Sequence, residues 1–115
     1  MFPSVADAAR RRERLERACE VQGREPLTYS MMTGCLLGDD EGQVRDRGRR
    51  LMELTGQQGE LDPWLEGLRA AWVIGTPEQA AERLAEYEQA GVERVMLQHQ
   101  LHDDVDMVAL MGRLT

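Results

Sequence analysis

The sequence predicts an α/β fold with two parallel strands and four or five helices. Three observations support this. Helical and strand-like segments alternate along the chain, residues 27–37 form an apolar run, and a capped helix leads directly into a second strand at residues 92–98. The 115 residues, 42% of them hydrophobic, suffice for one domain, residues 1–115, and not for two. Because two parallel strands cannot make a self-sufficient sheet, we expect a homo-oligomer or a complementing segment to complete it.

The first two elements are marked by a helix cap and by the apolar run. Ser4 can cap a helix that continues to about Gln22. The apolar residues at 27–37 do not alternate, which is typical of a strand covered on both faces. Cys19 in the helix and Cys35 in the strand have neither a metal-ligand spacing nor the density of a disulfide scaffold. We interpret both as small buried hydrophobic residues.

Two further helices are predicted in the middle of the chain. A turn at residues 38–40 precedes a strongly charged helix at about residues 41–54, whose few apolar anchors are Val44, Leu51 and Leu54. Asp62-Pro63 then begins a short helix, in which Trp64, Leu68 and Trp72 fall four apart on one face. Such a stripe is more typical of core packing than of a ligand cover, since aromatic side chains bury a large area wherever they pack.

The joint between the next helix and strand is the most informative segment. Thr76 is a good N-cap, Pro77 suits the first helical position, and Gln79 can complete a capping box. One face of this helix is apolar, with Ala80, Ala81, Leu84 and Tyr87. Gly91 ends the helix, and residues 92–98 form a strand whose carboxyl end is the usual place for chemistry in α/β proteins.

A final helix follows the second strand. Asp103 or Asp104 is a natural N-cap for it. Its apolar residues keep helical spacing: Met107, Leu110, Met111 and Leu114.

The composition excludes several classes of function. A net charge of -7 argues against a nucleic-acid surface, which needs an excess of basic side chains. No apolar run is long enough for a membrane span or a secretion signal, so we expect a cytoplasmic protein. All 14 basic residues are arginine, which removes lysine-based chemistry.

Much of the chain resembles the C-terminal portion of luciferase-like monooxygenases, and of their F420-linked branch in particular. The resemblance is carried by residues 18–19, 23–26, 32–35, 72–84, 87, 90–92 and 94–98. It implies a partial TIM barrel, from (β/α)8 oxidoreductases that use reduced flavin (FMN) or the deazaflavin F420. Residues 28–37 would be the seventh strand and residues 92–98 the eighth, with residues 2–4 following the sixth.

The resemblance also limits what the chain can do alone. In the family, the residues that grip the cofactor ring and act on substrate come mainly from earlier strands, so no catalytic residue is carried over. We therefore expect a fragment or short relative of an FMN- or F420-dependent oxidoreductase that is not competent alone. The alternative is a small non-catalytic α/β protein that self-associates through its Met-rich last helix and the face of Trp64 and Trp72.

The candidate pocket residues lie at strand ends. Gln98, His99 and His102 come at the end of the last strand, where barrel loops form the active face. Histidines can relay protons or bind anions, but with no third and fourth ligand at regular spacing we predict no metal site. Gly75 and Thr76 start a helix whose free N–H groups could receive a phosphate. The nearby carboxylate of Glu78 favours ordinary capping there instead.

Overall fold

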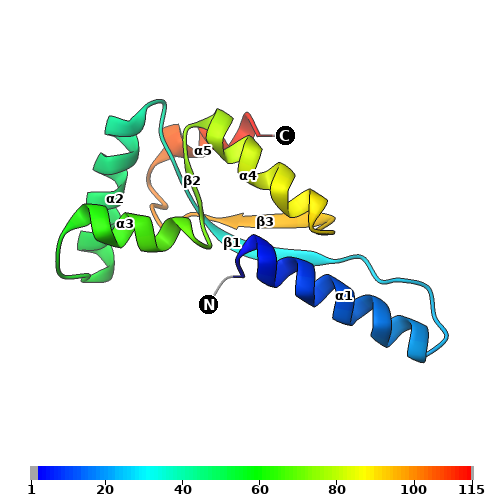
Figure 1. Ribbon diagram of the computed structural model, residues 1–115. Coiled ribbons are helices and arrows are strands. Elements are labelled where there is room, and N and C mark those ends of the chain that lie inside the picture. Colours follow the sequence, from blue (N-terminus) through cyan, green and yellow to red (C-terminus); the bar gives the residue numbers. More distant parts are fainter. Residues whose placement is uncertain (1–2, 115) are drawn as a thin grey trace.

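The structure is a computed structural model that describes residues 3–114, and it is an α/β fold with a small parallel sheet (Figure 1). The described elements are, in chain order, α1 Val5–Val21, β1 Ser30–Leu37, α2 Glu41–Thr55, α3 Leu61–Arg69, β2 Val73–Gly75, α4 Pro77–Gln89, β3 Arg94–Gln98 and α5 Val105–Gly112. The helix starts agree with the predicted caps because Ser4, Asp40, Thr76 and Asp104 each accept a backbone hydrogen bond from their own first turn. The prediction of an α/β fold is therefore confirmed.

The sheet has three strands rather than the predicted two. β1 lies in the centre and pairs in parallel with β2 on one side and β3 on the other. The two neighbours are staggered, because β3 pairs with residues 30–34 of β1 and β2 pairs with residues 35–37. The prediction missed β2, since its three residues are too few to show a period and they follow the predicted tryptophan stripe directly.

The crossovers place helices on both faces of the sheet. α2 and α3 connect β1 to β2 on one side of it, and α4 connects β2 to β3 on the other side of β1. Because the two crossovers run in opposite directions and are both right-handed, α2 and α3 lie on one face of the sheet and α4 lies on the other. Figure 1 shows α2 and α3 on one side of the sheet and α4 on the other, with α1 projecting along the start of β1.

Two cores result from this arrangement. The large core joins the carboxyl half of β1, β2 and all helices except α1, with these buried residues: Cys35, Leu36, Leu37, Val44, Leu51, Leu65, Val73, Ile74, Ala80, Leu101, Met107 and Leu110. The small core joins α1, α4 and the start of β1, with Ala8, Tyr29, Met31, Tyr87 and Val92. Burial of Cys19 and Cys35 confirms the interpretation of both as core residues.

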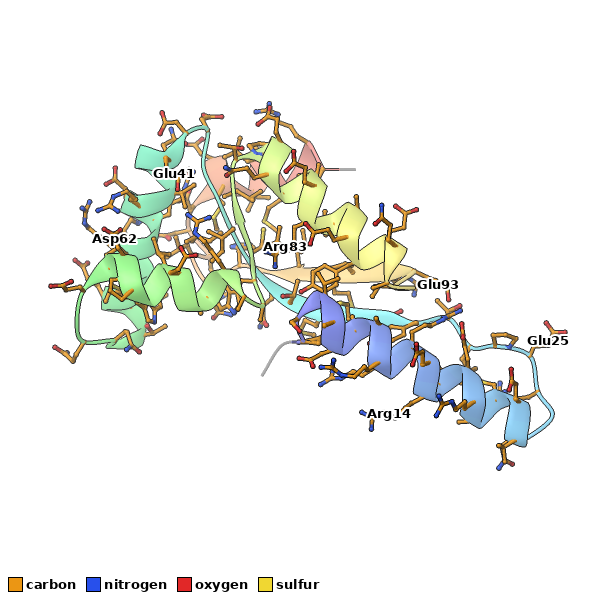
Figure 2. The ribbon with its side chains drawn as sticks, in the orientation of Figure 1. Arg14, Glu25, Glu41, Asp62, Arg83 and Glu93 are labelled. Carbon is orange, nitrogen blue, oxygen red and sulfur yellow. The ribbon has the colours of Figure 1, made fainter. Side chains whose placement is uncertain are left out.

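Polar contacts close the small core at its ends. Tyr87 donates from its hydroxyl to the carbonyl of Pro3, with an O···O distance of 2.8 Å. Glu93, labelled in Figure 2, accepts from the guanidinium of Arg12 at 2.7 Å and from the backbone N–H of Tyr29 at 3.1 Å. The carboxylate thus ties the start of β3 to α1 and to the residue before β1.

Some predicted anchors differ from the observed ones. Leu54 is 63% exposed, and Met52 is buried in its place because the large core lies on the face of α2 that carries residues 44, 48, 51 and 52. Ala81 is exposed because the apolar face of α4 is narrower than predicted. Trp72 lies beyond the end of α3, yet Trp64, Leu68 and Trp72 all pack against the large core, which confirms that the stripe serves packing.

Within residues 3–114, one part of the sheet carries no helix. We call it the open face, and it consists of the exposed residues Ser30, Met32, Arg94, Met96 and Gln98 on β1 and β3. Met32 and Met96 are register partners and are 46% and 47% exposed. The radius of gyration is 15.8 Å, against about 13 Å for a compact domain of this length. The fold is therefore elongated and leaves apolar strand surface uncovered.

Candidate functional site

The segment after β3 forms the candidate site, because it faces α2 across an open cavity. The cavity has a volume of about 560 Å³. Its walls come from α2 and from the loop between β3 and α5, and they consist of Arg50, Glu53, Leu54, Gln100, Leu101, His102 and Asp103. In open α/β sheets, ligands bind in the crevice outside the carboxyl ends of the strands, and the segment after β3 lies at such an end.

The structure brings His99 and His102 together. Their ring centroids are 5.6 Å apart and the rings are tilted by 55°. His102 is exposed and lines the cavity, whereas His99 is half-buried and is not among the lining residues. Within residues 3–114, Nδ1 of His99 is a buried polar atom without a hydrogen-bond partner. An unsatisfied buried nitrogen costs about 1–3 kcal/mol, so a bound polar group that satisfied it would gain affinity.

The other predicted pocket residues lie apart from the two histidines. Gln98 is exposed on the open face and does not line the cavity. Gly75 aligns with Leu37 of β1, whereas Gln98 aligns with Gly34, so the ends of β2 and β3 are staggered along the central strand. The predicted set therefore divides into three places: the histidines at the cavity, Gln98 on the open face, and Gly75 and Thr76 at the end of β2.

Gly75 and Thr76 are engaged in capping α4. Thr76 accepts from the N–H of Gln79, and the side-chain oxygen of Gln79 accepts from the N–H of Thr76 at 3.0 Å. Gly75 has φ +139°, and a Cβ at this position would lie 2.2 Å from that same Gln79 oxygen. This reciprocal capping box confirms ordinary capping as the role of the helix start.

A buried ion pair fixes the loop that carries the histidines. Asp104 accepts two hydrogen bonds from the guanidinium of Arg47, at 2.9 and 3.3 Å, and one from Arg50 at 2.8 Å. It also caps α5 by accepting from the N–H of Met107. These bonds, with that from Arg47 the strongest influence, lower the pKa of Asp104 to about 2 despite its burial. The carboxylate is thus ionised at neutral pH, and the loop is held against α2.

The chemistry available in the cavity is polar and acid–base in kind. Arg50 is already engaged by Asp104 at 2.8 Å and lies 3.6 Å from Asp103, so its charge is largely neutralised. His102 is therefore the group best placed to donate to or accept from a ligand. Among the described residues, no three His, Cys, Asp or Glu side chains lie close enough to hold a metal ion.

The two cysteines lie away from this chemistry. Cys35 is fully buried in the large core, and burial raises the pKa of its thiol to about 12. Cys19 is also buried, on α1. Neither thiol lines the cavity after β3.

A second groove, of about 460 Å³, runs beside the start of β1. Its walls come from the N-terminus of the described chain, α1 and residues 28–32, and they include Pro3, Arg11 and Leu15. It lies at the end of the molecule remote from the histidines. None of the predicted pocket residues lines it.

Sequence reasoning missed the contribution of α2 to the site. Arg47 and Arg50 are three residues apart and so share a helix face, which was a usable signal, but nothing local indicated that this face would meet Asp104.

No helix in the described part of the chain is both long and apolar enough to cross a lipid bilayer. A comparison with models of known protein families gives no match, and a comparison with curated proteins gives no significant match.

Proposed function

We propose that this chain is the C-terminal part, or a short relative, of a luciferase-like oxidoreductase that uses FMN or F420. One observation carries the proposal. Over residues 30–34 and 94–98, the segments that resemble the seventh and eighth barrel strands, β1 and β3, are direct parallel neighbours, with α1 and α4 packed on one face and the open face on the other. α2 and α3 lie on the side of the open face and pack against the carboxyl half of β1 and β2. Over this uncovered stretch the arrangement matches a barrel wall, in which the helices form an outer ring and the opposite strand faces point inward.

The free strand edges are compatible with further barrel strands. β2 covers only residues 35–37 of β1, so in the described part of the chain residues 30–34 have no strand on that side. β3 is the outermost strand on the other side. In the proposed barrel, a sixth strand would pair with the first of these edges and a first strand with the second.

The residues present do not enclose a cofactor. An isoalloxazine-type ring needs apolar walls on both faces, whereas the cavity after β3 is open and only Leu54 and Leu101 among its lining residues are apolar. His99 and His102 suit a polar part of a ligand, but nothing opposite them covers a ring. We therefore assign no redox step to this chain and expect little or no activity from it alone.

Cofactor titration tests the expectation that the chain alone does not bind FMN or F420. Oxidised and reduced FMN and F420 are titrated into the chain and followed by fluorescence, and no binding is expected at micromolar concentration. Micromolar binding of either cofactor by the monomer would overturn the claim that the chain is incompetent alone.

A chimera tests whether the chain can complete a cofactor-binding barrel. Residues 3–114 replace the corresponding segment of a luciferase-like oxidoreductase, and the chimera is expected to bind the cofactor of its host. A His99→Ala, His102→Ala version is the matched comparison, and weaker binding is expected from it. A chimera that folds by circular dichroism but binds no cofactor would contradict the proposal.

The alternative function is a small non-catalytic α/β protein that self-associates. The exposed pair Met32 and Met96 beside a free strand edge favours it. Because Met107 is buried and Trp64 and Trp72 pack against the large core, we place the interface of this alternative on the open face instead of on the surface expected from the sequence. A tight homodimer that is indifferent to both cofactors would support this function over the first.

A further inference from the structure

We propose that β3 pairs with β3 of a second copy, antiparallel and centred on Met96, so that two sheets of three strands join into one. This inference deepens the self-association alternative stated above and does not rest on the oxidoreductase function, in which a first barrel strand would occupy the same edge of β3. It concerns the outer edge of β3 and the adjoining open face, which no other element of the described chain covers.

The outer edge of β3 offers unpaired backbone groups. Arg94 donates its N–H to the carbonyl of Tyr29, on the side of β1. Because backbone groups alternate sides along a strand, those of Met96 and Gln98 also point to β1, and those of Val95 and Leu97 point outward. In residues 3–114, no backbone hydrogen bond is formed by these outward groups.

The edge carries few of the devices that prevent pairing. Proteins protect edge strands with proline, lysine, bulges or a covering loop. β3 contains no proline or lysine, and its five residues pair with β1 without a bulge. Its single charged residue, Arg94, stands at its first position and not in its middle. Its side chains are exposed on the open face and half-buried on the other, so a partner strand would meet no covering helix.

Backbone geometry is satisfied when Met96 lies on the twofold axis. Val95 of each copy then faces Leu97 of the other, and the two pairs exchange four backbone hydrogen bonds. Met96 faces its own copy as a non-hydrogen-bonded pair, in which Cα atoms are about 4.5 Å apart and the side chains are closest. The axis stands perpendicular to the sheet, so the two open faces lie on the same side of the joined sheet.

The side chains complement one another in this register. Met32 and Met96 of both copies form one apolar strip across the four central strands, which buries surface that is half exposed in the single chain. Arg94 stands opposite Gln98 of the second copy, and Glu93 stands opposite its His99, so no like charges face each other. Moving the register by two residues toward the start of β3 would place Arg94 opposite Met96 and Glu93 opposite Leu97.

A second copy is the occupant that the observations favour. Polar residues lie at both ends of β3 and apolar residues lie in its middle. An antiparallel copy of the strand therefore places polar residues opposite polar residues and apolar residues opposite apolar residues. A strand from an unrelated protein would need the same pattern by chance, whereas a second copy has it by symmetry.

Disulfide trapping tests the register. In Met96→Cys, the facing thiols lie at a Cα separation within the range for a disulfide, so mild oxidation is expected to give a covalent dimer. The matched control is Val108→Cys on α5, a residue that is 45% exposed like Met96 but lies away from β3. A third variant, Val95→Cys, is expected not to crosslink because Val95 faces Leu97. Crosslinking of the Val95 or Val108 variant at the rate of the Met96 variant would overturn the register.

Charge pairing tests whether the dimer forms through this edge. The wild-type chain is expected to elute with about twice its mass of 13.0 kDa in light scattering. Met96→Glu and Met96→Lys place like charges opposite each other and are each expected to be monomeric, while a mixture of the two restores a dimer. Val108→Glu is the control that should remain dimeric, and circular dichroism checks the folding of every variant.

Two outcomes would overturn the proposal that two copies pair through β3. One is a wild-type chain that stays monomeric at submillimolar concentration, and the other is a Met96→Glu variant as dimeric as the wild type. Both measurements are made without FMN or F420, so their failure leaves the oxidoreductase proposal standing. Failure of the cofactor titration or of the chimera likewise leaves the dimer proposal standing.

Discussion

Arg47 and Asp104 form a buried ion pair in which Nε of the arginine lies 2.9 Å from Oδ2 of the aspartate, although the residues are 57 positions apart. Both side chains are about nine-tenths buried. Arg47 also donates to the carbonyl of Leu37 at 2.9 Å, so one guanidinium joins α2, the end of β1 and the start of α5. Removing one member of such a pair leaves the other charged and buried.

Asp104→Ala is expected to be strongly destabilising. The variant loses the cap of α5 and leaves Arg47 without its carboxylate, so we expect the free energy of unfolding to fall by about 3–5 kcal/mol. Urea denaturation followed by circular dichroism measures this. Asp103→Ala is the control, since Asp103 is 90% exposed and should change stability by no more than about 0.5 kcal/mol. Equal effects from the two variants would show that the ion pair does not hold the loop.

The pH dependence of stability should contain a contribution from the same carboxylate. Its pKa is lowered from 3.8 to about 2 in the folded chain, mainly by the hydrogen bond from Arg47. A lowered folded-state pKa gives stability that is complete above the unfolded pKa and is lost as the pH falls toward 2. We expect a loss on the order of 1–2 kcal/mol between about pH 4.5 and 2. Asp104→Asn, which can still cap α5, should lack this part of the profile, and an identical profile would refute the assignment.

Most of the helices could be predicted because their signals are local. Ser4, Thr76 and Asp104 cap helices through residues only three positions away, and those bonds form in the structure. β2 could not be predicted in this way, since its place in the sheet depends on Leu36 and other residues of a distant strand. The ion pair between Arg47 and Asp104 could not be predicted either, because it forms only when α2 and the loop before α5 pack together.

Gly34→Ala should disturb the centre of the sheet. A Cβ at this position would lie 2.2 Å from the indole ring of Trp72, which covers the strand there. We expect a loss of about 1–3 kcal/mol from overpacking, measured by urea denaturation, and a shift in tryptophan fluorescence. Gly67→Ala on α3 is the matched control because no atom lies within 4 Å of the added Cβ. It should be neutral or stabilising by up to about 1 kcal/mol, as alanine is the better helix former.

The thiol of Cys35 should be unreactive in the folded chain. Burial raises its pKa to about 12, so at pH 8 the reactive thiolate is on the order of 1 part in 10,000, and the side chain is also shielded. In a Cys19→Ala background, labelling by a maleimide is expected only at the rate of unfolding. Val108→Cys in the same background supplies an exposed thiol for comparison and should react at once. Equally fast labelling of Cys35 would mean that the large core opens readily.

The stagger of the sheet has a consequence for how the chain loses its structure. The first half of β1 belongs to the small core and pairs with β3, while its second half belongs to the large core and pairs with β2. Met31 and Leu36 therefore report on different cooperative units of one strand, joined near Thr33 and Gly34. Native-state hydrogen exchange would see α1 and the small core open first, at lower free energy, while the backbone amides at residues 35–37 stay protected until the whole molecule unfolds.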